Sequence, residues 1–307
     1  KKTGTIVAVG AEAKQMLGRT PPHIKAVRPL GDGVISDFEV TEEMLGYLIN
    51  KIEKMSPKFF RPRVVVGVPS GITSVETRAV YDAAKNAGAR EVYIVEEPTA
   101  AAVGIRLPIH DPVGSMIVDI GVGTTDIAVI SLGGIVQSKN LTIAGDKLNC
   151  DISDFFKNQF KLLIGEKTAE NIKIAIGSAL PLAEPVEIEV RGRDLITGLP
   201  RAVLVNDEDI REAMAPSIQT LVEGIREVLE NTPPEILADI MHRGIVLVGG
   251  GALIKGLSQL LERKVKMPIH IAEDPITAVA RGTGVILENL PKYKDIIIDT
   301  QYESAPR

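Results

Sequence analysis

Cysteine is nearly absent from this chain of 307 residues, and long apolar runs and an excess of positive charge are missing as well. The single cysteine, Cys150, excludes a disulfide within these residues and is typical of a reducing compartment. No apolar run approaches the roughly 20 residues that a membrane-spanning helix needs. Lys and Arg number 35 against 40 Asp and Glu, which argues against nucleic-acid binding, because that needs a basic face.

Metal chemistry based on histidine or cysteine is not indicated either. The four histidines show no metal-ligand spacing and are expected to be ordinary surface or packing residues: His23, His110, His242 and His270. Cys150 has no catalytic partner near it in the sequence, so we expect it to be buried in the core.

The chain is long and apolar enough for about two domains, at 307 residues and 45% hydrophobic residues. Short apolar runs alternate with amphipathic segments, which predicts an α/β fold with mixed sheets. Expected strands are 63–68, 92–95, 116–120, 127–131, 135–143, 186–190 and 202–205, with another at Ile269. Expected helices are 74–87, 98–104, 147–163, 168–178, 207–230, 255–263 and 275–290.

Two glycine-rich turns, about 130 residues apart, each follow an expected buried strand. The first lies in residues 116–126 (MIVDIGVGTTD) and the second in residues 245–251 (IVLVGGG). Glycine lets a backbone turn sharply and approach a ligand closely, and the amides of such turns bind phosphates. Because the acidic Asp119 closes the first strand, the pair predicts a nucleotide site.

A helix rich in small residues lies near each turn in the sequence, at residues 99–102 (TAAA) and 277–282 (TAVARG). Small residues allow two helices to cross closely, so the pair could form a hinge between two lobes. Close packing inside one large domain is the alternative.

These motifs together resemble the actin-like ATPase superfamily, and within it the MreB family of bacterial actins. The resemblance is carried by residues 96–102 (EEPTAAA), 119–125 (DIGVGTT), 249–251 (GGG) and 278–282 (AVARG). Residues 66–73, 143–146, 164–170 and 197–201 are similar to the MreB family in particular, and the likeness covers nearly the whole chain. One departure is Val122, where the family usually has glycine, and a positive φ there would strain a β-branched residue.

The resemblance implies a two-lobed actin-like fold, with duplicated mixed sheet-and-helix domains around a nucleotide cleft. Residues 1–111 and 281–307 would form the first lobe, with a small subdomain at about 1–31. Residues 112–280 would form the second, with a large subdomain at about 112–147 and 212–280 and a small one at about 148–211. The family begins with a hairpin bearing a further phosphate loop, which these residues lack. We therefore expect residues 1–307 to be a fragment of a longer polypeptide.

Site residues follow from the same resemblance. Asp119 would hold Mg²⁺ through water, although a carboxylate at a strand end can also be a simple turn residue. Glu97 would orient or activate the attacking water, with helix capping as the alternative. Thr124 would help to place that water. The β- and γ-phosphates of ATP or ADP would contact Gly121, Gly123, Thr124 and Thr125.

The nucleoside end of the site is expected on two other segments. Glu170 and Lys173 lie three residues apart on one expected helix, so they share a face, which in the family meets ribose and adenine. A solvated ion pair is the alternative. The adenine and α-phosphate would lie against Gly249, Gly250, Gly251 and Ala252.

Two adjacent aromatic residues, Phe59 and Phe60, stand between Lys58 and Arg61 in an expected loop. Apolar rings flanked by basic residues suit an anionic bilayer surface, and in the MreB family a loop at this place contacts the inner membrane. Ordinary packing of the two rings is the alternative.

Three classes of function fit the superfamily: a filament-forming ATPase of the cytoskeleton, a sugar-type metabolic kinase, and a chaperone-type ATPase. The MreB-like segments favour the first. The resemblance implies a cytoplasmic protein at the inner face of the membrane that polymerises with itself and hydrolyses ATP slowly. Its filaments would guide cell-wall synthesis and rod shape together with membrane proteins of the cell-elongation machinery.

Overall fold

The computed structural model describes residues 6–53 and 61–298, which form two compact units. Among the described residues, unit 1 comprises residues 6–53, 61–68, 72–96 and 286–298, and unit 2 comprises residues 69–71 and 97–285. The chain therefore changes unit at residues 96/97 and 285/286, and a three-residue segment between two elements of unit 1 is assigned to unit 2. The subdomain limits drawn from the sequence stay predictions.

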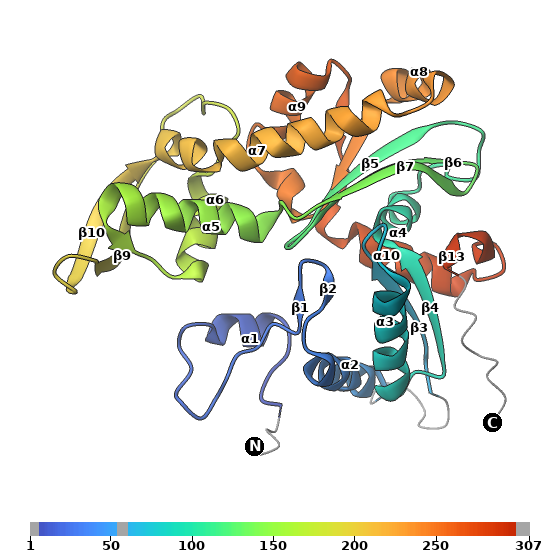
Figure 1. The fold of residues 1–307 in the computed structure, drawn as a ribbon, viewed down its shortest axis with the longest axis horizontal. Coiled ribbons are helices and arrows are strands. Elements are labelled where there is room, and N and C mark those ends of the chain that lie inside the picture. Colours follow the sequence, from blue (N-terminus) through green and yellow to red (C-terminus); the bar gives the residue numbers. More distant parts are fainter. Residues whose placement is uncertain (1–5, 54–60, 299–307) are drawn as a thin grey trace. The chain divides into compact units, whose positions relative to one another are not determined.

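Unit 1 is built on a three-stranded sheet in the order β13-β4-β3 (Figure 1). Strands β3 (Arg63–Val68) and β4 (Glu91–Glu96) are parallel, and β13 (Ile297–Ile298) is antiparallel to β4. Helix α3 (Ser74–Asn86) packs on β3 and β4 and contacts α2 (Phe38–Glu53). The remaining elements are α1 (Ala11–Met16) and the hairpin of β1 (Leu30–Gly31) and β2 (Val34–Ile35).

Unit 2 is built on a five-stranded sheet in the order β12-β11-β5-β6-β7. Its parallel half consists of β5 (Ser115–Ile120), β11 (Ile245–Val248) and β12 (Ile269–Ile271). Strands β6 (Thr125–Ser131) and β7 (Gly134–Leu141) continue from β5 as an antiparallel meander, as the sequence predicts. All six residues of β5 are buried, which agrees with the apolar residues at 116–118 and at Ile120.

Helices cover this sheet and create the main core of unit 2. The long α7 (Asp207–Glu230) begins with a capping box made by Asn206 and Asp209, and it packs on β6 and β7 (Figure 1). It also contacts α5 (Gly145–Phe155), α6 (Glu166–Ile176) and α9 (Leu257–Val265). The remaining helices are α4 (Glu97–Gly104), α8 (Pro234–Arg243) and α10 (Ala278–Glu288), with short turns at η2 (Gly250–Leu253) and η3 (Pro275–Thr277). The short turn η4 (Lys294–Ile296) belongs to unit 1.

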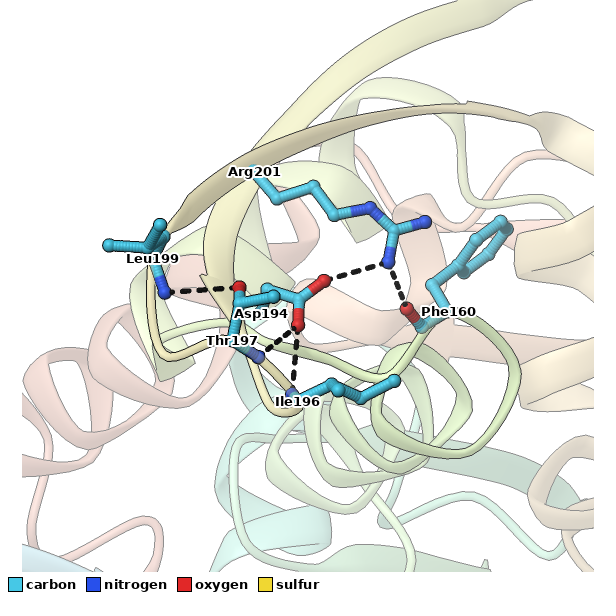
Figure 2. A network of polar contacts seen from close by, with 6 residues as sticks. All are labelled: Phe160, Asp194, Ile196, Thr197, Leu199 and Arg201. Atoms are coloured by element: carbon cyan, nitrogen blue, oxygen red, sulfur yellow. Dashed lines mark hydrogen bonds and ion pairs between the residues drawn. The ribbon is translucent and has the colours of Figure 1, made fainter.

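A second, smaller sheet of unit 2 has the order β10-β9-β8. The hairpin of β9 (Glu187–Asp194) and β10 (Pro200–Asn206) is closed by a polar network around Asp194 (Figure 2). The Asp194 carboxylate accepts the backbone N–H groups of Ile196 (2.8 Å) and Thr197 (2.9 Å) and a guanidinium N–H of Arg201 (3.0 Å). These bonds hold the pKa of Asp194 down at about 2. The turn is therefore a fixed structure.

The expected helix at 147–163 is confirmed as helical up to residue 160, but its last three residues are not helical. Helix α5 ends at Phe155 and continues as one π-helical segment, η1 (Phe156–Phe160). Lys161 then adopts a left-handed conformation, and β8 (Leu162–Leu163) pairs with the end of β9. Leu162 is fully buried there, so its burial in the small sheet replaces continued helix formation.

Candidate active site

The two glycine turns lie side by side at the carboxyl ends of neighbouring parallel strands. In the β5/β11 pairing, Asp119 stands opposite Val248, so Ile120 and Gly249 are the next residues on each side. Both turns therefore belong to unit 2. In open α/β sheets this edge is where ligands bind.

The second turn needs glycine because it presses against the first strand. Gly249 has a φ of +78°, and a Cβ there would lie 2.3 Å from the Ile120 carbonyl oxygen. A Cβ on Gly251 would lie 2.1 Å from Ile120 Cγ2. By contrast, Gly250 is exposed, with nothing within 4 Å of an added Cβ. Ala252 is fully buried, so among these residues Gly250 offers the open backbone.

The first turn is closed by its own hydrogen bonds. The Gly121 amide donates to the Thr124 carbonyl (3.0 Å), so a phosphate contact from this amide requires that bond to open. The amides of Gly145 and Asp146, at the start of α5, donate to the carbonyls of Gly121 (3.2 Å) and Val122 (2.8 Å). Val122 is 66% exposed and is not among the described residues with positive φ, so the departure from glycine causes no strain.

The two threonines of the turn differ in what their hydroxyls do. Thr124 is buried, and its side chain donates a hydrogen bond to the carboxylate of Asp126. Thr125 is fully buried, and its hydroxyl donates to the Ile143 carbonyl oxygen (2.6 Å). This hydroxyl ties β6 to the segment just after β7, and the expected contact of Thr125 with phosphate stays a prediction.

Three carboxylates gather at this edge of unit 2. Burial, and then the negative charges of Asp126 and Asp119, raise the pKa of Glu97 to about 8. Burial, and then Asp126, raise the pKa of Asp119 to about 7. Burial also raises the pKa of Asp126, while hydrogen bonds from Asn140, Ser70 and Thr124 oppose that shift. Clustered carboxyl groups with pKa values near neutrality are a common property of active sites.

Sequence reasoning missed Asp126 as a member of this group. It stands at the start of β6, opposite Asp119 in the β5/β6 pairing, and only 1% of it is exposed. An acidic residue inside a run that is otherwise suited to a buried strand was the available signal.

Lys173 brings a positive charge to the first glycine turn. Its ammonium donates to the Gly145 carbonyl oxygen (2.8 Å). A Cβ on Gly145 would lie 3.4 Å from both Lys173 Nζ and the Gly121 carbonyl oxygen, which places the ammonium beside the turn. Glu170 lies one helical turn earlier on α6 and is partly buried. The structure thus brings Lys173 to the first glycine turn, and the role of Glu170 at the nucleoside stays a prediction.

The two helices of small residues cross in direct backbone contact, as the sequence predicts. A Cβ on Gly282 of α10 would lie 1.7 Å from the Ala100 carbonyl oxygen of α4. A Cβ on Gly104 would lie 2.0 Å from the Ala278 carbonyl oxygen. Because α4 begins with Glu97, this crossing also fixes the helix that carries the carboxylate.

Comparison with known proteins shows which family the chain belongs to. The model of the family described as MreB/Mbl protein matches residues 1–295. The chain belongs to the MreB/Mbl family. It is 50% identical over 292 residues to the cell shape-determining protein Mbl of Bacillus subtilis, a match that spans 95% of this chain and 87% of Mbl. It is also 50% identical over 284 residues to the cell shape-determining protein MreB of Escherichia coli, spanning 92% and 82%.

Solved structures agree with the family and the actin-like fold. MreB5 of Spiroplasma citri, solved with ADP and with AMPPNP, matches with a TM-score of 0.89 and 36% identity, over 96% of this chain and 88% of MreB5. The MamK double helical filament matches with a TM-score of 0.78 and 26% identity, over 92% and 85%. Membership of the MreB/Mbl family favours the cytoskeletal class over the kinase and chaperone alternatives.

Other sequence predictions for this MreB/Mbl chain fall outside the site. Cys150 is exposed, which corrects the expected burial: the buried face of α5 carries Leu148, Asn149 and Ile152. Phe59 and Phe60 lie outside the described residues. Among residues 6–53 and 61–298, no helix is long and apolar enough to cross a membrane, and no group of three or more His, Cys, Asp or Glu is arranged to hold a metal ion.

Proposed function

We propose that this MreB/Mbl chain binds ATP, hydrolyses it slowly, and assembles with copies of itself in the control of cell shape. The observation that carries the proposal is the group formed by the half-buried Glu97 and the buried Asp119 and Asp126, beside two adjoining glycine turns. Support also comes from MreB5, a relative solved with ADP and AMPPNP bound.

We assign the two ends of the nucleotide to two different parts of the site. Gly250 offers open backbone, with Gly249, Gly251 and Ala252 supporting its turn, so this segment suits the adenosine end. The first turn suits the phosphates through Gly123 and Thr124, with the Lys173 ammonium nearby as the opposite charge. Glu170 at the ribose rests on the family resemblance.

Glu97 is the residue that we assign to the attacking water. A pKa of about 8 lies close to the working pH, which is where a group that takes up a proton during reaction performs best. Phosphoryl transfer depends mainly on positioning and charge stabilisation, so one oriented carboxylate is sufficient for slow hydrolysis. Thr124, held by its bond to Asp126, is assigned to help place the water.

Asp119 fits a role toward Mg²⁺. It is a single carboxylate, 7% exposed, whose charged form is disfavoured by burial and then by the charge of Asp126, which stands opposite. Mg²⁺ is usually held by one or two carboxylates together with substrate phosphates and water, so a ready-made cage of protein ligands is not needed. When bound there, the ion would neutralise phosphate charge.

Self-assembly is supported by MamK, a structural neighbour solved as a double helical filament. The β9–β10 turn offers a contact surface for a second copy of this chain. Ile196 is 80% exposed and Leu199 is 65% exposed, although the turn that carries them is fixed by the Asp194 network (Figure 2). Apolar side chains on a pre-ordered turn suit association, because little conformational freedom is lost on binding.

Membrane contact through Phe59 and Phe60 stays a prediction from the sequence, as do partners in the cell-elongation machinery and a cytoplasmic location at the inner face of the membrane. The relatives Mbl and MreB are cell shape-determining proteins, which supports a role in cell shape.

A single pair of measurements tests the enzymatic part of the proposal. We expect Glu97→Gln to lower single-turnover ATP hydrolysis by about 10²–10⁴-fold, because the water-orienting group is lost. AMPPNP affinity, measured by calorimetry, should change by no more than a few fold. Glu212→Gln, at an exposed position of α7, is the matched control and should behave as wild type. Absence of AMPPNP binding to the wild-type protein would contradict the proposal itself.

A further inference from the structure

The segment that follows β3 is set apart from the elements on either side of it. Strand β3 ends at Val68 in unit 1, and α3 of unit 1 begins at Ser74, yet residues 69–71 are assigned to unit 2. Gly71 has a φ of +75° and lets the chain turn back toward α3. Ser70, at the centre of this segment, is only 6% exposed.

Ser70 is fixed by a carboxylate of the candidate active site. Its backbone N–H donates to Asp126 Oδ1 (2.8 Å), and the Asn140 side-chain amide donates to the same oxygen (3.0 Å). The Thr124 side chain donates to this carboxylate as well. Asp126 therefore ties the backbone of Ser70 to the phosphate turn, although the two residues are 56 positions apart in the sequence.

The hydroxyl of Ser70 takes no part in these hydrogen bonds. Ser70 Oγ is buried and has no hydrogen-bond partner among the described residues. A buried hydroxyl without a partner is unfavourable, and such groups in native proteins usually serve a ligand or a function. Here the unused donor belongs to a residue bound directly to the site's carboxylate cluster.

A terminal phosphate needs neutral and positive donors in this place. Glu97, Asp119 and Asp126 would repel an anion in their ionised forms, so the phosphate must be bound by N–H and O–H groups around them. Lys173 is one such group, on the α5 side of the turn. We propose that the Ser70 hydroxyl is another, and that it donates a hydrogen bond to the terminal phosphate of the bound nucleoside triphosphate. This inference rests on the proposed nucleotide-binding function and assigns a residue outside the two glycine turns to it.

The test compares two nucleotides that differ at the terminal phosphate. Calorimetry gives the affinities of the wild-type protein and of Ser70→Ala for AMPPNP and for ADP, each with Mg²⁺. We expect Ser70→Ala to weaken AMPPNP binding roughly tenfold and ADP binding less than twofold, because one bond to the terminal phosphate is lost. The ratio of the two affinities does not depend on the fraction of protein that is folded.

Ser115→Ala is the matched control. Ser115 Oγ is also buried without a partner among the described residues, but it lies at the opposite end of β5 from Asp119. This variant removes the same group from the same unit and should leave both affinities unchanged. If Ser70→Ala does not fold, Ser70→Cys replaces it, since a thiol is of similar size and a weak donor.

The outcomes separate this inference from the proposed function. A lower AMPPNP-to-ADP affinity ratio in Ser70→Ala, but not in Ser115→Ala, supports the assignment. An unchanged ratio with normal wild-type binding overturns the role of Ser70 and leaves the proposed function standing. Failure of the wild-type protein to bind either nucleotide overturns both.

Discussion

At the residue scale, the carboxylates of the candidate site repel one another electrostatically. Glu97 and Asp119 are desolvated and lie near Asp126, so their charged forms are unfavourable and their pKa values rise. Such a site holds extra protons near neutral pH. A ligand that brings positive charge or hydrogen-bond donors relieves this, which suits a site that binds a nucleotide together with a cation.

The raised pKa of Glu97 predicts how stability depends on pH. The folded pKa of about 8 lies above the roughly 4.3 of an unfolded Glu, so between these values the folded state holds more protons. The free energy of unfolding should therefore fall as pH rises, by up to about 1.4 kcal/mol per pH unit from this group. Glu97→Gln should flatten the fall, as measured by urea unfolding between pH 5 and 8 without nucleotide and with EDTA. Parallel curves for Glu97→Gln and wild type would contradict this, and Glu212→Gln serves as control.

From the sequence, site residues could be predicted only where a local motif marks them. Asp119 and Gly249 were identified because each ends or follows an apolar strand, and the structure brings them together. Ser70 and Asp126 could not be paired, since their contact spans 56 residues and depends on the fold. Likewise, the partner of the Thr125 hydroxyl, Ile143, is set by how β7 ends.

At the element scale, the close crossing of α4 and α10 depends on residues with very small side chains or none. Ala100, Gly104, Ala278 and Gly282 recur at four-residue spacing, so one face of each helix is nearly flat and the backbones meet. This packing was predictable from the small residues in both segments. Whether the crossing acts as a hinge is a separate proposal from the family resemblance.

Two glycines of α10 provide a matched test of this crossing. Gly282→Ala places a methyl group 1.7 Å from the Ala100 carbonyl oxygen, so the helices must separate, and we expect a loss of about 1–3 kcal/mol or more in unfolding free energy. Gly284→Ala, in the same helix, meets nothing within 4 Å and should be neutral or stabilise by up to about 1 kcal/mol. Urea denaturation of both variants measures the difference. Equal effects would show that the contact is not tight.

Other elements escaped prediction for identifiable reasons. Helix α2 was not predicted, although Asp37 accepts the Val40 amide (3.1 Å) as a helix-start residue does. Helix α8 was not predicted either, although Pro234 begins it and Gly244, with a φ of 82°, follows its end. The strand β8 has only two residues, which is too short for a recognisable sequence pattern. It forms because it pairs with β9. The long α7, with its capping box and apolar stripe, was predicted to the residue.

At the scale of the whole molecule, the proposed nucleotide site and the proposed surface for self-assembly both belong to unit 2. The carboxylate cluster lies on its five-stranded sheet, and the exposed β9–β10 turn lies on its small sheet, with α7 contacting both sheets. Relatives solved as MreB5 with nucleotide and as the MamK filament represent these two properties separately. If both operate in this chain, the binding surface and the nucleotide site should be separable by mutation.

The β9–β10 turn provides that separation. We expect the double variant Ile196→Asp, Leu199→Asp to raise the protein concentration needed for ATP-dependent pelleting by tenfold or more, since burying one such side chain contributes roughly 1.5–3 kcal/mol. AMPPNP affinity should stay at the wild-type value, because neither residue belongs to the nucleotide site. Leu132→Asp is the control: Leu132 is 69% exposed at the β6–β7 turn, and its φ of 51° suits Asp. Pelleting of the double variant at the wild-type concentration would exclude this turn from assembly and leave the nucleotide chemistry of unit 2 unaffected.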